Sequence, residues 1–75
     1  MSADEERLAL LKKNAEGAYD RMYDERRPQD CYRDAMELFG EAIDLARTLG
    51  KSEEVTALEA RRDHVRAVFR SQFSR

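Results

Sequence analysis

The sequence predicts an all-α protein that folds as a three-helix antiparallel bundle, running up, down and up. Ala, Leu, Glu and Arg are abundant and favour helices, whereas the strand-forming residues Val, Ile and Thr are few. Apolar residues recur at steps of three and four in three segments, which Pro28 and Gly50 separate. Because both connections are only a few residues long, successive helices must be antiparallel neighbours. The 75 residues leave room for one domain, 1–75, with one small core.

The first helix is expected at 3–25. The residues SADE at 2–5 have capping-box spacing, with a serine hydroxyl for an orphan amide and a glutamate three residues later. Pro28 follows and disfavours a helical conformation in the residue before it, so the helix is expected to end upstream of it. The apolar stripe of this helix consists of Leu8, Leu11, Ala15, Ala18 and Met22, with Tyr19 and Tyr23 beside it.

The second helix is expected at 30–49, with Asp30 as its N-cap. Gly50 is the residue expected to close it in the left-handed conformation. Its apolar arc is wider than one neighbouring helix can cover, which predicts that it packs between the other two helices. Phe39 should then lie near the centre of the core. The arc contains Tyr32, Ala35, Met36, Leu38, Phe39, Ala42, Ile43, Leu45, Ala46 and Leu49.

The third helix is expected at 53–72, with Ser52 as its cap and a stripe that ends in Phe69 and Phe73. If the second and third helices fold back about Lys51, an acidic stripe should meet a basic one. Such exposed pairs contribute only about 0–1 kcal/mol each, so they would select the register more than add stability. The expected pairs are Glu41 with Arg62, Glu37 with Arg66 and Asp34 with Arg70.

The segment YRDAMELFGEAIDLARTLG, at 32–50, resembles the second helix of a tetratricopeptide repeat. The matching positions are Tyr32, Ala35, Phe39 and Ala42, and Tyr19 and Met22 match the first helix of the repeat. The resemblance covers Glu16 to Leu49 and implies a helical hairpin that serves as a protein-interaction scaffold without catalysis, with the third helix as a cap. Tyr23 departs from the family, which prefers a small residue there, and no second repeat is visible.

Composition and motifs argue against catalytic, metal-binding and membrane-spanning functions. The net charge of −2 gives no overall field for nucleic acid or anionic membrane. Cys31 and His64 are the only thiol and imidazole, too few for a zinc site, and no glycine-rich phosphate loop is present. We therefore expect no catalytic or metal-binding residue, no enzyme activity, no cofactor and no small-molecule substrate. A single cysteine fits a reducing, cytoplasmic location, and no apolar run reaches the length of a membrane span.

The remaining features predict a small protein-interaction module. The tyrosines near the first turn either cap the core with their hydroxyls in water or lie exposed as interface anchors. Leu10 lies off the apolar stripe of its helix, and Phe73 extends beyond the reach of the second helix. The expected partner-binding residues are Leu10, Tyr19, Tyr23, Phe69 and Phe73, with Arg66 and Arg70 steering the partner by charge.

Two alternatives remain open at this stage. The same apolar patches would suit a self-associating, homodimeric structural protein, which predicts a mass that depends on concentration. The basic last helix would suit a nucleic-acid accessory protein, although it lacks interleaved residues to read bases. That alternative predicts binding that weakens steeply with salt and is lost when Arg62, Arg66 and Arg70 are neutralised.

Overall fold

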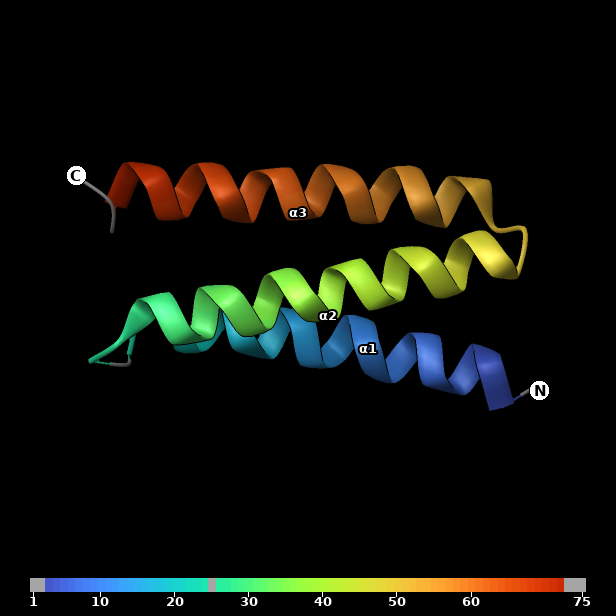
Figure 1. The fold of residues 1–75 in the computed structure, drawn as a ribbon, viewed down its shortest axis with the longest axis horizontal. Coiled ribbons are helices and arrows are strands. Elements are labelled where there is room, and N and C mark those ends of the chain that lie inside the picture. Colours follow the sequence, from blue (N-terminus) through green and yellow to red (C-terminus); the bar gives the residue numbers. More distant parts are fainter. Residues whose placement is uncertain (1–2, 25, 73–75) are drawn as a thin grey trace.

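The computed structural model describes residues 3–24 and 26–72, and they form three helices: α1 (Ala3–Arg21), α2 (Pro28–Thr48) and α3 (Ser52–Gln72). Figure 1 shows α2 running antiparallel to both α1 and α3 and lying between them in the view. α2 packs along both neighbours, whereas α1 and α3 approach each other closely at few points. The Cα envelope measures 41 × 19 × 13 Å, so the bundle is flattened. The predicted three-helix antiparallel bundle, with α2 in the middle, is confirmed.

The core is built from small residues around one large aromatic ring. Phe39 is 1% exposed and lies within the cluster of buried residues, as predicted. Ala35 and Ala42, one turn on either side of it, are fully buried and let the neighbouring helices approach closely. No polar or charged side chain is buried among the described residues. The core contains Leu8, Leu11, Ala15, Ala18, Met22, Cys31, Ala35, Phe39, Ala42, Ile43, Ala46, Leu58 and Val65.

The connection between α1 and α2 differs from the prediction. α1 ends at Arg21 and not at residue 25, because the amides of Met22, Tyr23 and Asp24 turn back to the carbonyls of Tyr19, Asp20 and Arg21. Glu25 lies outside the described residues. α2 begins at Pro28, two residues before the predicted start, since the missing amide hydrogen of proline costs nothing in the first turn of a helix. Asp30 is therefore inside the first turn, where the helix dipole favours an acid, and is not the N-cap.

The connection between α2 and α3 agrees with the prediction. Gly50 has φ of 72°, in the left-handed region. The amide of Lys51 donates to the carbonyl of Ala46 at 2.9 Å, and that of Gly50 donates to Arg47 at 3.1 Å. These two bonds form a Schellman motif, which satisfies carbonyls at the end of α2. α3 then begins at Ser52, one residue before the predicted start, so Ser52 lies in the first turn of the helix and is not its cap; the amide of Val55 donates instead to the carbonyl of Lys51 at 3.0 Å.

The predicted ion pairs between α2 and α3 are wrong, although the antiparallel register behind them is close. Tyr32 stacks on Phe69 and Arg47 lies 3.8 Å from Glu59, which is nearly the expected alignment. Glu41, however, follows Tyr32 by nine residues, and so points about 180° away around the α2 axis. The acids of α2 thus face away from α3. The ion pairs of Arg62 and Arg66 in the described structure are with Asp63 of their own helix, at 3.8 and 3.5 Å.

Candidate functional site

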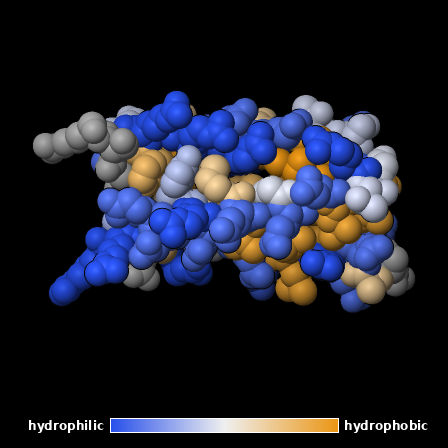
Figure 2. All heavy atoms as spheres, in the orientation of Figure 1, coloured by the Kyte–Doolittle hydropathy of each residue, from blue (hydrophilic) through white to orange (hydrophobic). Residues whose placement is uncertain are grey.

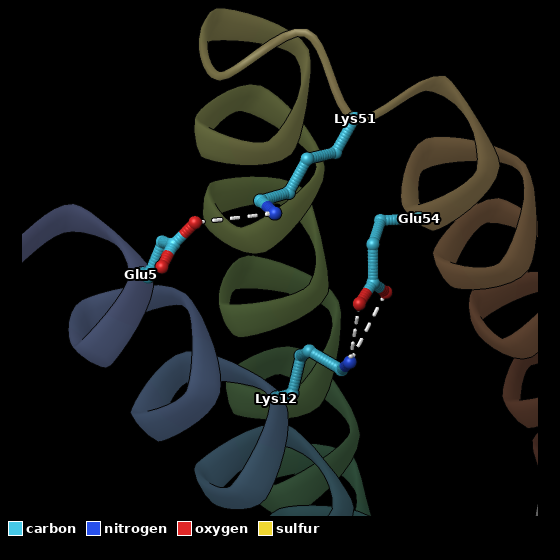
Figure 3. Close-up of polar contacts among 4 residues, drawn as sticks. All are labelled: Glu5, Lys12, Lys51 and Glu54. Carbon is cyan, nitrogen blue, oxygen red and sulfur yellow. Dashed lines mark hydrogen bonds and ion pairs between the residues drawn. The ribbon is translucent and has the colours of Figure 1, made fainter. Parts of the chain in front are cut away.

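Charged side chains span the gap between α1 and α3. The ammonium group of Lys12 donates to both carboxylate oxygens of Glu54, at 2.9 and 3.0 Å. Lys51, in the turn before α3, lies 3.4 Å from Glu5. Figure 3 shows these side chains reaching toward each other from α1 and from the start of α3. A third pair, Glu16 with Arg61, continues the row, and we call the three pairs the charged seam. Along α1 its charges alternate as acid, base and acid, and the facing residues alternate in the opposite sense.

The pair of Arg61 and Glu16 has the strongest geometry of the seam. The Nε of Arg61 donates to Glu16 Oε2 at 2.7 Å, and a second guanidinium nitrogen donates to Oε1 at 2.8 Å. This two-bond arrangement fixes the direction of both side chains as well as their distance. The hydrogen bond from Arg61 lowers the pKa of Glu16 below its usual range, and the same bond raises the pKa of Arg61.

Next to this pair, aromatic rings gather at the end of α1. Tyr19 and Tyr23 meet edge to face with 5.7 Å between ring centroids, and one hydroxyl donates to the other at 3.1 Å. The ring of His64 meets Tyr19 edge to face at 6.3 Å, and the guanidinium of Arg61 lies 5.1 Å above the Tyr19 ring. The hydrogen bond with Tyr23 raises the pKa of Tyr19. We call Tyr19, Tyr23, Arg61 and His64 the tyrosine cluster.

The tyrosine cluster is both exposed and held in place. Tyr23 has 50% of its surface exposed, whereas Tyr19 is half-buried and packs against the core. The guanidinium group of Arg61 covers one face of the Tyr19 ring, and Glu16 holds that guanidinium group by hydrogen bonds. Of the two interpretations for the tyrosines, core capping thus describes Tyr19 and exposure describes Tyr23.

The other predicted contact residues do not join this cluster. Leu10 is 58% exposed, but it precedes Tyr19 by nine residues and so lies about 180° away around α1. Phe69 is half-buried, because its ring stacks on Tyr32 with centroids 4.1 Å apart and planes 14° from parallel. This stacking packs the C-terminal half of α3 against the start of α2.

The predicted arginines are also apart from the tyrosine cluster. Arg66 follows Arg61 by five residues, so it lies about 140° around α3 from the side that faces Tyr19. Arg70 is exposed one turn further along. Phe73 lies outside the described residues. The structure therefore brings together Tyr19 and Tyr23 of the predicted set, and places Leu10, Phe69, Arg66 and Arg70 elsewhere.

Three residues of the site were not predicted as contacts: Glu16, Arg61 and His64. Arg61 and His64 are three residues apart, so one face of a helix carries both, and this spacing was the available signal. Nothing in the sequence pairs Glu16 with Arg61, because 45 residues separate them. Their meeting depends on how α3 lies against α1.

The described residues offer little for a bound ion or small ligand. Among residues 3–24 and 26–72, no group of three or more His, Cys, Asp or Glu side chains could hold a metal ion. Cys31 is a free thiol buried in the core, whereas His64 is exposed beside Tyr19. The hollows are open and shallow; one of about 280 Å³ lies at the turn between α2 and α3, beside Arg47, Gly50 and Val55. None of the described helices has the length and apolar character needed to cross a membrane.

Comparison with known proteins gives no relative: no family model matches the chain, and neither the curated proteins nor the solved structures contain a match.

Proposed function

We propose that this protein is a small, non-catalytic interaction module, and that the tyrosine cluster is its contact surface for another protein. The observation that carries the proposal is Tyr23, an aromatic side chain that is 50% exposed yet held in a fixed arrangement with Tyr19. Tyrosine is enriched among the residues that dominate binding energy, because it offers a large apolar ring together with a polar hydroxyl.

Rigidity of the cluster supports this role. Ordering a flexible side chain during binding costs free energy, and a side chain that is already ordered avoids that cost. Tyr23 is tied to Tyr19, and Tyr19 is tied through Arg61 to Glu16. His64 adds a ring that can donate or accept a hydrogen bond at the edge of the surface.

We further propose that α1 and α2 form a tetratricopeptide-like hairpin with α3 as its cap, acting in the cytoplasm. The burial of Ala35, Phe39 and Ala42 supports the hairpin, since this is the alternation of small and aromatic residues that the repeat carries in its second helix. The free thiol of Cys31 supports a reducing compartment.

The test is affinity capture from a nuclease-treated lysate of the source organism, with three baits: the unchanged chain, Tyr23→Ala and Leu10→Ala. Leu10 is the matched control, because it is another exposed large apolar residue and lies on the side of α1 turned away from Tyr19. We expect one specific protein on the unchanged and Leu10→Ala baits, and its loss from the Tyr23→Ala bait. With the purified partner, Tyr23→Ala should weaken binding by about thirtyfold, as for a typical hot-spot residue.

Either of two results would contradict the proposal. The first is a partner that Leu10→Ala releases and Tyr23→Ala retains, which would place the contact surface on the other face of α1. The second is the absence of any specific protein on the unchanged bait.

A further inference from the structure

The outward face of α2 carries a row of acids that is interrupted by one basic residue, Arg33. Asp30, Asp34, Glu37, Glu41 and Asp44 follow one another at steps of three and four residues, and all are exposed. Asp44 has one contact, 3.8 Å to Arg47 of the same helix. Within the described part of the chain, the carboxylates of the other four make no ion pair or side-chain hydrogen bond. Like charges one turn apart repel and destabilise a helix, so this acidic face favours a cationic neighbour.

A complementary row lies on α3. Arg62, Arg66 and Arg70 are four residues apart, which places them in one line along the helix. The Nε of Arg62 is buried and has no hydrogen-bond acceptor, and its closest carboxylate oxygen, on Asp63, is 3.8 Å away. Arg66 shares the same Asp63, at 3.5 Å. One carboxylate thus serves two guanidinium groups, and this basic row is incompletely neutralised.

The acidic row is long enough to cover the basic row, and the two cannot meet within one chain. Arg62 to Arg70 spans about 12 Å of α3, and Asp30 to Asp44 spans about 21 Å of α2, at 1.5 Å per residue. The acids of α2 point away from α3, and the ion pairs predicted between these two helices do not form. A second copy of the chain can bring the rows together, with α2 of one copy antiparallel to α3 of the other.

Apolar surface borders the acidic face. A hollow of about 260 Å³ between α1 and α2 is lined by the apolar residues Leu11 and Leu45, with Arg7, Glu41 and Asp44 beside them. Figure 2 shows hydrophobic residues exposed among polar ones on the face turned to the viewer, mostly toward the end of the bundle that carries the start of α1 and the turn between α2 and α3. A partner placed on the acidic face would cover apolar surface as well as charge, which exposed ion pairs alone do not supply.

We propose that the chain forms a two-fold symmetric homodimer in which the acidic face of α2 in each copy contacts the basic row of α3 in the other. A two-fold axis makes each contact occur twice, so one matched pair of rows gives two charge-complementary contacts. The dimer surface is separate from the tyrosine cluster, so this proposal stands or fails independently of the hetero-partner described above.

The experiment is sedimentation equilibrium of the full chain over a wide concentration range, at about 50 mM and at about 500 mM salt. We expect the mass to rise from that of one chain toward that of two. High salt should weaken the association by about tenfold or more, because mobile ions screen charges at the rim of an interface. A mass of one chain at all concentrations, or association that salt leaves unchanged, would overturn the proposal.

Charge reversal then identifies the surfaces. Glu37→Lys with Glu41→Lys places two cations of α2 opposite the basic row, and Arg66→Glu with Arg70→Glu places two anions of α3 opposite the acidic row. Each double variant alone should be monomeric at concentrations where the unchanged chain is dimeric, because like charges face each other across the interface. An equimolar mixture of the two should restore the mass of two chains, which a general effect on folding would not do.

The matched control is Asp20→Lys with Asp24→Lys, which gives the same change of net charge on exposed residues at the end of α1. This variant should dimerise like the unchanged chain. Equal loss of association in the control, or a mixture of the two reversed variants that stays monomeric, would contradict the assigned surfaces. Circular dichroism of each variant verifies that the helices are retained.

Discussion

At the scale of single residues, the pair of Glu16 and Arg61 has the widest consequences. It closes the charged seam at one end and fixes the arginine that covers the Tyr19 ring. Contacts between residues close in sequence could be predicted from helical spacing, as for Tyr19 and Tyr23, which are four residues apart. The pair of Glu16 and Arg61 could not be predicted, because many acids of this chain could pair with many arginines until the position of α3 against α1 is known.

The lowered pKa of Glu16 predicts how stability changes with pH. Its carboxylate is bound by Arg61 in the folded chain and free in the unfolded chain, so the pKa is lower in the folded state. Stability from this pair is therefore present above the ordinary carboxyl pKa near 4.5 and is lost as the pH falls through the folded value.

Thermal unfolding between pH 3 and pH 7, for the unchanged chain and Glu16→Gln, measures this effect. We expect the unchanged chain to have the higher Tm at pH 7, and the difference to shrink toward pH 3. Because Glu16 is 41% exposed, solvent screening keeps the difference to a few degrees. A Tm difference that is constant across this range would contradict the ion-pair explanation.

At the scale of helices and turns, local sequence rules predicted the end of α2 but not its start. The Schellman turn at Gly50 was predicted because a glycine after a long apolar helix has few other roles. The start of α2 was misjudged, since proline was interpreted only as the end of α1. In fact it occupies the first turn of the next helix, where its fixed φ is suitable.

Two glycines give a matched test of the turn. A side-chain carbon added at either Gly40 or Gly50 would meet no atom within 4 Å, so only the backbone conformation distinguishes them. Gly50→Ala should lower the free energy of unfolding by about 1 kcal/mol, because φ of 72° is unfavourable for alanine. Gly40→Ala, inside α2, should raise it by about 0.5–1 kcal/mol. Urea unfolding of both variants measures this, and the same sign for both would contradict the assigned turn.

At the scale of the whole molecule, the order and direction of the helices followed from periodicity and short connections. The rotation of α2 about its own axis did not follow, because its apolar arc is wide enough to fit several rotations. The structure chooses the one that stacks Tyr32 on Phe69 and leaves the acids outside. That choice removes the expected pairs between α2 and α3, and leaves an acidic and a basic row that do not face each other, from which the homodimer is inferred.

The proposed contact surface depends on how α3 packs against α1, since these two helices meet mainly through the charged seam and the tyrosine cluster. The most direct measurement is nuclear Overhauser spectroscopy of the full chain. We predict cross-peaks between the ring protons of Tyr19 and His64, whose centroids are 6.3 Å apart, alongside those between Tyr32 and Phe69 at 4.1 Å. If the second set appears and the first is absent, α3 packs on α2 without closing against α1, and the tyrosine cluster does not form.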